Sequence, residues 1–431
     1  MYKKLSIFVA LLGLLLFTQL QVAWAEKPST FPSHTSESKP LADFIRLVIS
    51  SSPRSRSVDA SLQASSARYD AAGQPLYNPE LELDAERSDI DTTSIGLSQA
   101  IDWSDKREAQ VKVARSAHSA AIAEAVFLRQ ELAIELLKAL GEYHTANAIE
   151  ELGKERLQLM QEFAAIAEKR YLAGDLNQVE LDLAKLASLE ANLESAELRT
   201  RLSDAQKTLA ALMGEVPVLE VWPTLPEMLP DIQQDNINVE KILQEHPLFR
   251  AKKGYEEVAR SSIDLRQRET RPDPTISIRA GREDEETLTG LTLSVPLFVR
   301  NTYRAEVAEA NAQLTQSQYD ARDTWFDLKS QLDAAFRRYV LTHNTWKDWQ
   351  QQGEASLRRR VELLEQLWQA GELGTTDYLV QLKQTLDTQG ASTELRGRLW
   401  QAWSDWLTAS GTVFQWLDID PSQLDANATL D

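Results

Sequence analysis

Side chains that commonly hold transition metals or transfer protons are few and scattered in this 431-residue chain. The five histidines form no H-E-x-x-H motif and no pair four residues apart: His34, His118, His144, His246 and His343. The chain has no cysteine, which excludes a thiolate nucleophile, a disulfide and a cysteine metal site. The residue types therefore predict no catalytic group, no cofactor and no metal site, so we do not expect an enzyme.

Three carboxylates alternate with apolar residues in the stretch PELELDAERS. They are Glu82, Asp84 and Glu86. A period of two is typical of a β-strand, so the acids share one face and the apolar residues share the other. Acids on the inner face of a channel would favour cations. The plainer alternative is that these acids favour no particular ion and only make the lining polar, as in any channel. Arg279, on a later strand, brings the opposite charge.

Two more acids follow glycines that end long helical patterns. Glu180 comes six residues after Gly174, and Asp377 comes six residues after Gly371. A glycine at the end of a helix can take the left-handed conformation that terminates it. Asn177 and Glu180 have the spacing of a capping box. The two acids are therefore helix caps, or charges that ring a constriction in an assembly, and the sequence leaves both readings open.

The N-terminus carries an export signal. Lys3 and Lys4 precede an apolar run from residue 5 to residue 17, and Ala23-Trp24-Ala25 fits an A-x-A cleavage site. We expect residues 1–25 to be a secretory signal peptide, because the run is shorter than the ~20 residues of a spanning helix. The alternative is a membrane anchor. The net charge of −19 argues against a nucleic-acid partner, which would need a basic face.

Prolines and glycines reveal an internal repeat with an offset of about 195 residues, too long for a solenoid. The matching pairs are Pro53 and Pro247, Pro79 and Pro274, Gly96 and Gly290, Gly174 and Gly371, and Gly214 and Gly411. The predicted divisions are a first repeat over 26–214, a Pro-rich linker over 215–236, a second repeat over 237–411, and a tail over 412–431. Each repeat reads as helix, β-hairpin, long helix, turn and return helix.

The predicted elements are unusual in length. We expect leading helices over about 41–72 and 238–269, then alternating strands of about ten residues that include Ile95, Leu97 and Val295. Proline-free long helices follow over 104–172 and 302–370, each roughly 100 Å long. Their alanine-rich stripe repeats about every 3.5 residues, which predicts supercoiled packing against other helices.

Four strands cannot close a barrel, since single-chain barrels begin at eight strands. Open strand edges are not viable in lipid. Either several copies close a barrel together, or the chain is not a membrane protein.

Taken together, these features resemble the TolC-like outer-membrane efflux family. The stretches NPELELDAE, GLSQAIDWSDKREAQ, RPDPTISI and GLTLSVPLFVRN are most similar to the branch that serves cobalt–zinc–cadmium and related heavy-metal exporters. The resemblance implies a mainly α chain with a small β part. Its long helices would form a periplasmic helical barrel, and its four strands would join a trimeric, twelve-stranded transmembrane β-barrel in outer-membrane lipid. Relatives that carry a lipidated N-terminal cysteine differ from this chain.

The resemblance also implies partners: a homotrimer, a periplasmic adaptor protein and an inner-membrane RND-type pump. By position, the adaptor would dock on the two turns, at Gly174, Asp175, Leu176, Gly371, Glu372 and Leu373. We expect both leucines to be exposed there. Glu180 and Asp377 would lie at the periplasmic aperture, which acidic residues close in the family. Val380 stands where a further acid is expected, so this closure would differ.

The predicted function is a passive exit duct that conducts divalent heavy-metal cations to the outside. The same fold would serve drug or organic-solute efflux, or type I protein secretion. A distant alternative is a soluble periplasmic coiled-coil scaffold, which leaves the alternating strands unexplained.

Overall fold

The computed structural model describes residues 39–424, except 88, 90, 215–221 and 234–236. The predicted signal peptide, both ends of the predicted linker and the end of the predicted tail lie outside the described residues. The elements are α2 (Lys39–Ser51), α3 (Pro53–Ala72), β1 (Glu80–Arg87), β2 (Asp91–Ala100), α4 (Lys106–Ala173), α5 (Gln178–Met213), α6 (Val239–Glu245), α7 (Pro247–Glu269), β3 (Thr275–Glu283), β4 (Glu286–Ser294), α8 (Arg304–Gln369), α9 (Thr375–Ser410), α10 (Val413–Trp416) and the 3₁₀ helix η3 (Pro421–Leu424).

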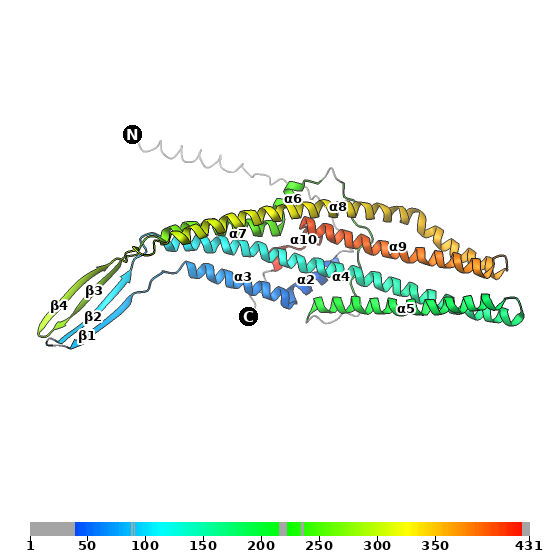
Figure 1. Cartoon of the computed structure of the whole chain (residues 1–431), viewed down its shortest axis with the longest axis horizontal. Coiled ribbons are helices and arrows are strands. Elements are labelled where there is room, and N and C mark those ends of the chain that lie inside the picture. The colour runs from blue at the N-terminus through cyan, green and yellow to red at the C-terminus, as the bar shows by residue number, and fades with distance from the viewer. Residues whose placement is uncertain (1–38, 88, 90, 215–221, 234–236, 425–431) are drawn as a thin grey trace, which may run out of the picture.

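The molecule is a long rod with the sheet at one end and two helical turns at the other (Figure 1). Helices α4 and α8 run most of its length, with 68 and 66 residues, as the proline-free stretches predicted. Each begins after a left-handed residue, Asp105 (φ 57°) and Tyr303 (φ 56°). The same backbone conformation therefore turns the chain from strand to helix in each repeat.

The helices lie side by side in rows, one row in the half of the rod near the sheet and another in the half near the turns. Nearer the sheet the order is α3, α4, α7, α8, and nearer the turns it is α5, α4, α9, α8 (Figure 1). Small residues allow α4 and α7 to approach closely: a Cβ on Gly254 of α7 would lie 2.7 Å from the Cβ of Ala120 on α4. This contact joins α4 to a helix of the other repeat, whereas the supercoil of the long stripe stays a prediction.

Each leading helix is in fact two helices, so the predictions of one helix over 41–72 and one over 238–269 are wrong. Ser52 separates α2 from α3, and His246 separates α6 from α7. Both residues are N-caps in extended backbone, and a proline follows each as the first residue of the next helix. Proline cannot continue a preceding helix but suits the first turn of a new one.

Those two prolines also contact the glycines that end α5 and α9. A Cβ on Gly214 would lie 3.0 Å from Cδ of Pro53, and one on Gly411 would lie 2.8 Å from Cδ of Pro247. Both glycines have positive φ. The two repeats therefore build the same contact twice, where only glycine combines the left-handed backbone with the close approach.

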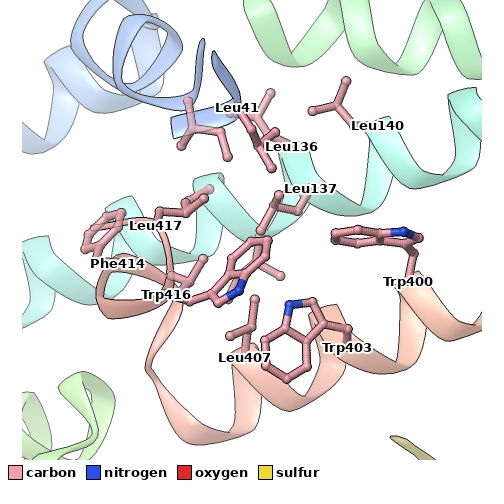
Figure 2. Close-up of a cluster of buried hydrophobic side chains, with 14 of the residues drawn as sticks. Leu41, Leu136, Leu137, Leu140, Trp400, Trp403, Leu407, Phe414, Trp416 and Leu417 are labelled. Carbon is pink, nitrogen blue, oxygen red and sulfur yellow. The ribbon is translucent and has the colours of Figure 1, made fainter. Parts of the chain in front are cut away.

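The largest hydrophobic core lies midway along the rod, where α2, α4, α9 and α10 meet (Figure 2). Trp403 is fully buried, and its ring lies 5.7 Å from that of Trp416 and 5.1 Å from that of Tyr339. Truncating one such ring to alanine costs about 3–5 kcal/mol. The described residues after α9 fold back into this core, where Phe414 and Trp416 are buried.

The four strands form one antiparallel sheet in the order β1-β2-β3-β4. Strand β2 joins the two hairpins by pairing with β3, from Thr92↔Glu283 to Ala100↔Thr275. Strand β4 ends at Ser294, so Val295 lies beyond it and not within it as predicted. Pro296 explains the early end, because proline cannot donate to the ladder.

Candidate functional site

One face of the sheet is apolar and open to its surroundings. Leu83 on β1 is 72% exposed and Leu291 on β4 is 75% exposed. The other large apolar side chains of this face are also exposed: Leu81, Ile95, Leu97, Ile276, Ile278 and Leu293. The face spans all four strands, and none of the described helices covers it. A soluble protein rarely leaves a contiguous apolar surface of this kind uncovered.

The opposite face is polar and made mostly of small residues. Ser94 and Ser98 on β2 are 6% and 3% exposed although they are polar. A Cβ on Gly281 would clash with the carbonyl oxygen of Thr93, and one on Gly290 would lie 2.8 Å from Nε of Arg279. Small residues permit crowding on this face, as on the inner side of a curved sheet.

The predicted acids lie on this polar face. Glu82, Asp84 and Glu86 are all exposed, and they alternate along β1 with the outward-facing leucines. Ser94 donates a hydrogen bond to Oδ2 of Asp84 at 3.4 Å. Glu82 pairs with Gly96, and Gly96 pairs in turn with Arg279. The charges on this face are therefore mixed: Arg279 lies among acids, since the register also places Glu80, Glu283 and Glu286 on the same face.

The first helical turn, at the other end of the rod, closes with hydrogen bonds that fully explain its glycine. Gly174 has φ 82°, its N–H donates to Tyr171 O at 3.0 Å, and the N–H of Asp175 donates to Arg170 O at 2.9 Å. The capping box is present: Asn177 Oδ1 accepts from the N–H of Glu180, and Glu180 Oε2 accepts from the N–H of Asn177, both at 3.0 Å. The carboxylate of Glu180 thus has a local role as a cap.

The second turn has the same glycine but a weaker cap. Gly371 has φ 78°, and its N–H donates to Trp368 O at 3.1 Å. Gly374 is the N-cap of α9, and it has no side chain to cap with. Asp377 lies exposed in the first turn of α9 and has no such capping box. Glu180 therefore caps the helix that follows its turn, whereas Asp377 makes no such capping hydrogen bond.

The leucines of the turns are half-buried, so they are less exposed than the turns that carry them. Leu176 and Leu373 pack against a tip cluster of eleven buried side chains that all four helices supply. The tip cluster is Met160, Phe163, Ala167, Leu181, Ala184, Ala191, Leu364, Trp368, Tyr378, Leu379 and Leu382. Each leucine therefore packs against a cluster that both hairpins supply, which hydrophobic burial favours at a helix end.

Aromatic rings hold the tip cluster together between the two hairpins. Trp368 of α8 stacks on Tyr378 of α9 at 4.8 Å, and Phe163 of α4 lies 4.9 Å from Trp368. The guanidinium of Arg170 lies 5.2 Å from the Trp368 ring, a cation–π contact between hairpins. Burial raises the pKa of Tyr378 to about 12. Sequence reasoning missed this cluster because its rings come from separate helices.

Metal ligands do not gather in the part of the chain that the structure describes. No three histidine or carboxylate side chains there are placed to hold a metal ion together. His144 and His246 each contact a backbone carbonyl, Pro223 O at 2.8 Å and Thr408 O at 3.2 Å. Among the described residues, none of the helices is long and apolar enough to cross a membrane.

Comparison with known proteins identifies the family. Residues 44–215 and 238–412 match the family described as Outer membrane efflux protein, which is most of the chain in two blocks. The chain belongs to the outer membrane efflux protein family. This outer membrane efflux protein is thus a passive channel protein and not an enzyme, and the alternative of a soluble scaffold is excluded.

Individual relatives agree with that assignment. The cobalt-zinc-cadmium resistance protein CzcC of Cupriavidus metallidurans is 24% identical over 258 residues, which is 57% of this chain and 60% of that protein. The match therefore spans about three fifths of the curated relative.

Solved structures share the fold. The outer membrane protein VceC of Vibrio cholerae has a TM-score of 0.71 at 18% identity, covering 87% of this chain and 97% of that one. The CmeC outer membrane channel of Campylobacter jejuni has a TM-score of 0.74 at 14% identity, covering 94% and 93%.

Proposed function

We propose that three copies of this outer membrane efflux protein form the exit duct of a tripartite efflux system. The duct passively conducts divalent heavy-metal cations, which an inner-membrane RND-type pump delivers through a periplasmic adaptor. The sheet lies in the outer membrane and the helices extend into the periplasm.

The sheet carries this proposal, because its apolar face is the exposed one and its polar face is partly buried. Its large apolar residues are exposed, while Ser94 and Ser98 on the other face are buried. This arrangement suits lipid outside and water inside. Four strands leave β1 and β4 with open edges, and lipid does not tolerate open edges. Edge pairing between copies would remove them, and three copies would supply twelve strands.

The repeat supports a ring of copies. Within one chain α4 packs between α3 and α7, whereas its repeat counterpart α8 lies at the end of the row beside α7. The missing neighbour of α8 is the counterpart of α7, which is α3 of another copy. Head-to-tail association of this kind forms a ring when the rotation between successive copies closes.

The position of the two turns supports adaptor docking. They carry Gly174, Asp175, Leu176, Gly371, Glu372 and Leu373, and both lie at the end farthest from the sheet (Figure 1). Of these six residues, the exposed side chains are Asp175 and Glu372, since both leucines are half-buried.

The cation preference rests on two observations. CzcC, named for cobalt, zinc and cadmium resistance, is a relative at 24% identity. The acids Glu82, Asp84 and Glu86 lie on the polar face, which lines the lumen in the proposed barrel.

Deleting the gene tests the substrate. We expect cells without it to become sensitive to zinc, cobalt or cadmium, with drug tolerance unchanged, and plasmid-borne protein to restore growth. A matched variant, Glu82→Gln with Asp84→Asn and Glu86→Gln, should restore growth only in part while reaching the membrane at the normal level. Unchanged metal tolerance with lost drug tolerance would assign the channel to drug or organic-solute efflux instead.

A further inference from the structure

A buried carboxylate lies where the strands meet the helices. Asp273 comes two residues before β3 and is 9% exposed. Its Oδ2 accepts a hydrogen bond from the hydroxyl of Tyr77 at 2.5 Å and pairs with Nζ of Lys106 at 2.8 Å. Lys106 also donates to Arg271 O at 2.7 Å. We call Tyr77, Lys106 and Asp273 the base clamp.

The base clamp gathers the ends of three strands. Tyr77 comes three residues before β1, Asp273 comes just before β3, and Lys106 is the first residue of α4, which follows β2. The β2–β3 ladder also runs on toward the clamp, because the N–H of Ile101 donates to Pro274 O at 2.9 Å. A single carboxylate therefore joins the β2–β3 seam to the start of α4.

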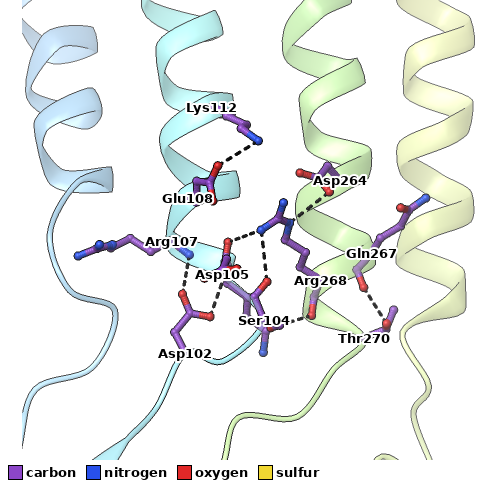
Figure 3. Close-up of polar contacts among 11 residues, drawn as sticks. Asp102, Ser104, Asp105, Arg107, Glu108, Lys112, Asp264, Gln267, Arg268 and Thr270 are labelled. Carbon is purple, nitrogen blue, oxygen red and sulfur yellow. Dashed lines mark hydrogen bonds and ion pairs between the residues drawn. The ribbon is translucent and has the colours of Figure 1, made fainter.

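A second set of contacts holds the same corner from the side of α7 (Figure 3). Arg268, in the last turn of α7, donates to Asp105 O at 2.9 Å and to Ser104 O at 3.4 Å. Asp102 accepts from the N–H of Lys106 at 2.8 Å, which caps α4. The start of α4 is thus fixed both to β3 and to α7.

The repeat shows what the other corner lacks. The counterpart of Lys106 is Arg304, the first residue of α8, and it is exposed. The prolines before β1 and β3 align Asp273 with Asn78 and Tyr77 with Pro272. Asn78 carries no charge and is exposed. The chain therefore builds a charged, buried clamp after β2 and has no counterpart of Asp273 for the corner after β4.

We propose that the base clamp fixes the β2–β3 seam to α4, so that the four strands of one chain form a single unit. Movement between sheet and helices is then confined to the corner after β4. A buried ion pair suits this role, because removing one partner leaves the other charge buried and unpaired. The confinement to the β4 corner rests on the assembly proposed above, whereas the fixed seam does not.

Hydrogen exchange of the detergent-extracted protein tests the clamp. Asp273→Asn should speed exchange of residues 99–106 by at least about tenfold, as expected for an unpaired buried lysine, and leave residues 92–96 of the same strand unchanged. Arg304→Met is the matched control and should change neither segment. Lys106→Met with Asp273→Leu should recover much of the protection, because an apolar pair can replace a buried ion pair.

Tyr77→Phe keeps the proposal falsifiable if Asp273→Asn does not accumulate. It removes one hydrogen bond and should speed exchange of residues 99–106 by a smaller factor. Unchanged exchange in this variant overturns the clamp. In wild-type protein, residues 297–304 should exchange faster than residues 99–106, and equal rates overturn the confinement to the β4 corner. Sizing of the same sample reports the assembly separately, so a failed trimer is distinguished from a failed clamp.

Discussion

His246 caps α7 only while its ring is neutral. Nδ1 accepts from the N–H of Leu248 at 3.3 Å, and Nε2 then donates to Thr408 O at 3.2 Å. Burial lowers the pKa of His246, and the hydrogen bond to Thr408 opposes that shift only in part. The folded state therefore binds this proton less readily than the unfolded state, so the stabilisation is complete above about pH 6.5 and is lost as the pH falls toward the folded pKa.

We expect His246→Asn to keep the cap and weaken the acid dependence, because asparagine is a good N-cap that does not titrate. His246→Ala should cost about 1 kcal/mol at neutral pH. The measurement is the melting temperature of detergent-extracted protein between pH 8 and pH 5. His144 has a lowered pKa as well, so some acid dependence should remain in both variants. Identical pH profiles for wild type and His246→Asn would contradict this account.

Asp377 and Glu180 differ in how far their own turns use them. Glu180 completes a capping box, whereas Asp377 has no such box. We expect Asp377→Asn to lower the cation preference of single channels in planar bilayers, and Glu180→Gln to add a smaller decrease. Both variants retain hydrogen-bonding capacity, so the fold should survive. Unchanged selectivity and unchanged block by multivalent cations in the double variant would leave both acids as helix caps.

At the scale of elements, the two hairpins are held together near their tips by packing and charge. Lys383 of α9 pairs with Glu190 of α5 at 2.6 Å, and Arg156 of α4 pairs with Asp387 of α9 at 3.1 Å. All these residues except Arg156 are about half exposed, so each pair contributes less than about 1 kcal/mol. The tip cluster is therefore the stronger link between the hairpins.

A test of docking at the turns needs variants that distinguish loss of the docking surface from loss of packing in the tip cluster. Leu176→Asp with Leu373→Asp should abolish export and keep the trimer in the membrane, although we expect a local loss of about 1–3 kcal/mol. Leu181→Ala is the matched control: Leu181 is 4% exposed in the same cluster, and its truncation costs about 2–5 kcal/mol without altering the turn surface. If the control also abolishes export, tip stability is what matters; if the double variant exports normally, docking lies elsewhere.

At the scale of the whole molecule, the repeat predicts where copies touch. Ala120 of α4 meets Gly254 of α7 inside one chain. Counting from the first residues of the matching helices, the equivalent pair between copies is Gln318 of α8 and Ala60 of α3, and both are exposed. The chain has no cysteine of its own, so engineered cysteines report without background.

We expect Ala60→Cys with Gln318→Cys to form disulfides between copies on oxidation, in a ladder that ends at three. Each single variant should give no ladder. The measurement is a non-reducing gel of protein from outer membranes, combined with sizing in detergent. A monomer or dimer as the largest species would contradict the ring of three.

The sequence by itself determined features that are local or repeated. Period two along β1, freedom from proline over α4 and α8, and the glycine turns at Gly174 and Gly371 each depend on backbone preferences that neighbouring residues impose. The capping box of Asn177 and Glu180 was predictable for the same reason and is confirmed. The breaks at Pro53 and Pro247 follow from equally local chemistry, because proline suits only the first turn of a helix.

Only the tertiary structure decided which distant residues meet. Tyr77 and Asp273 are 196 positions apart, and Trp368 meets Phe163 from another hairpin. No period or spacing encodes such contacts, because they depend on how the two repeats pack. The same reason explains why Leu176 and Leu373 are half-buried: a turn is exposed by its position along the chain, but the helices that converge on it cover part of its leucine.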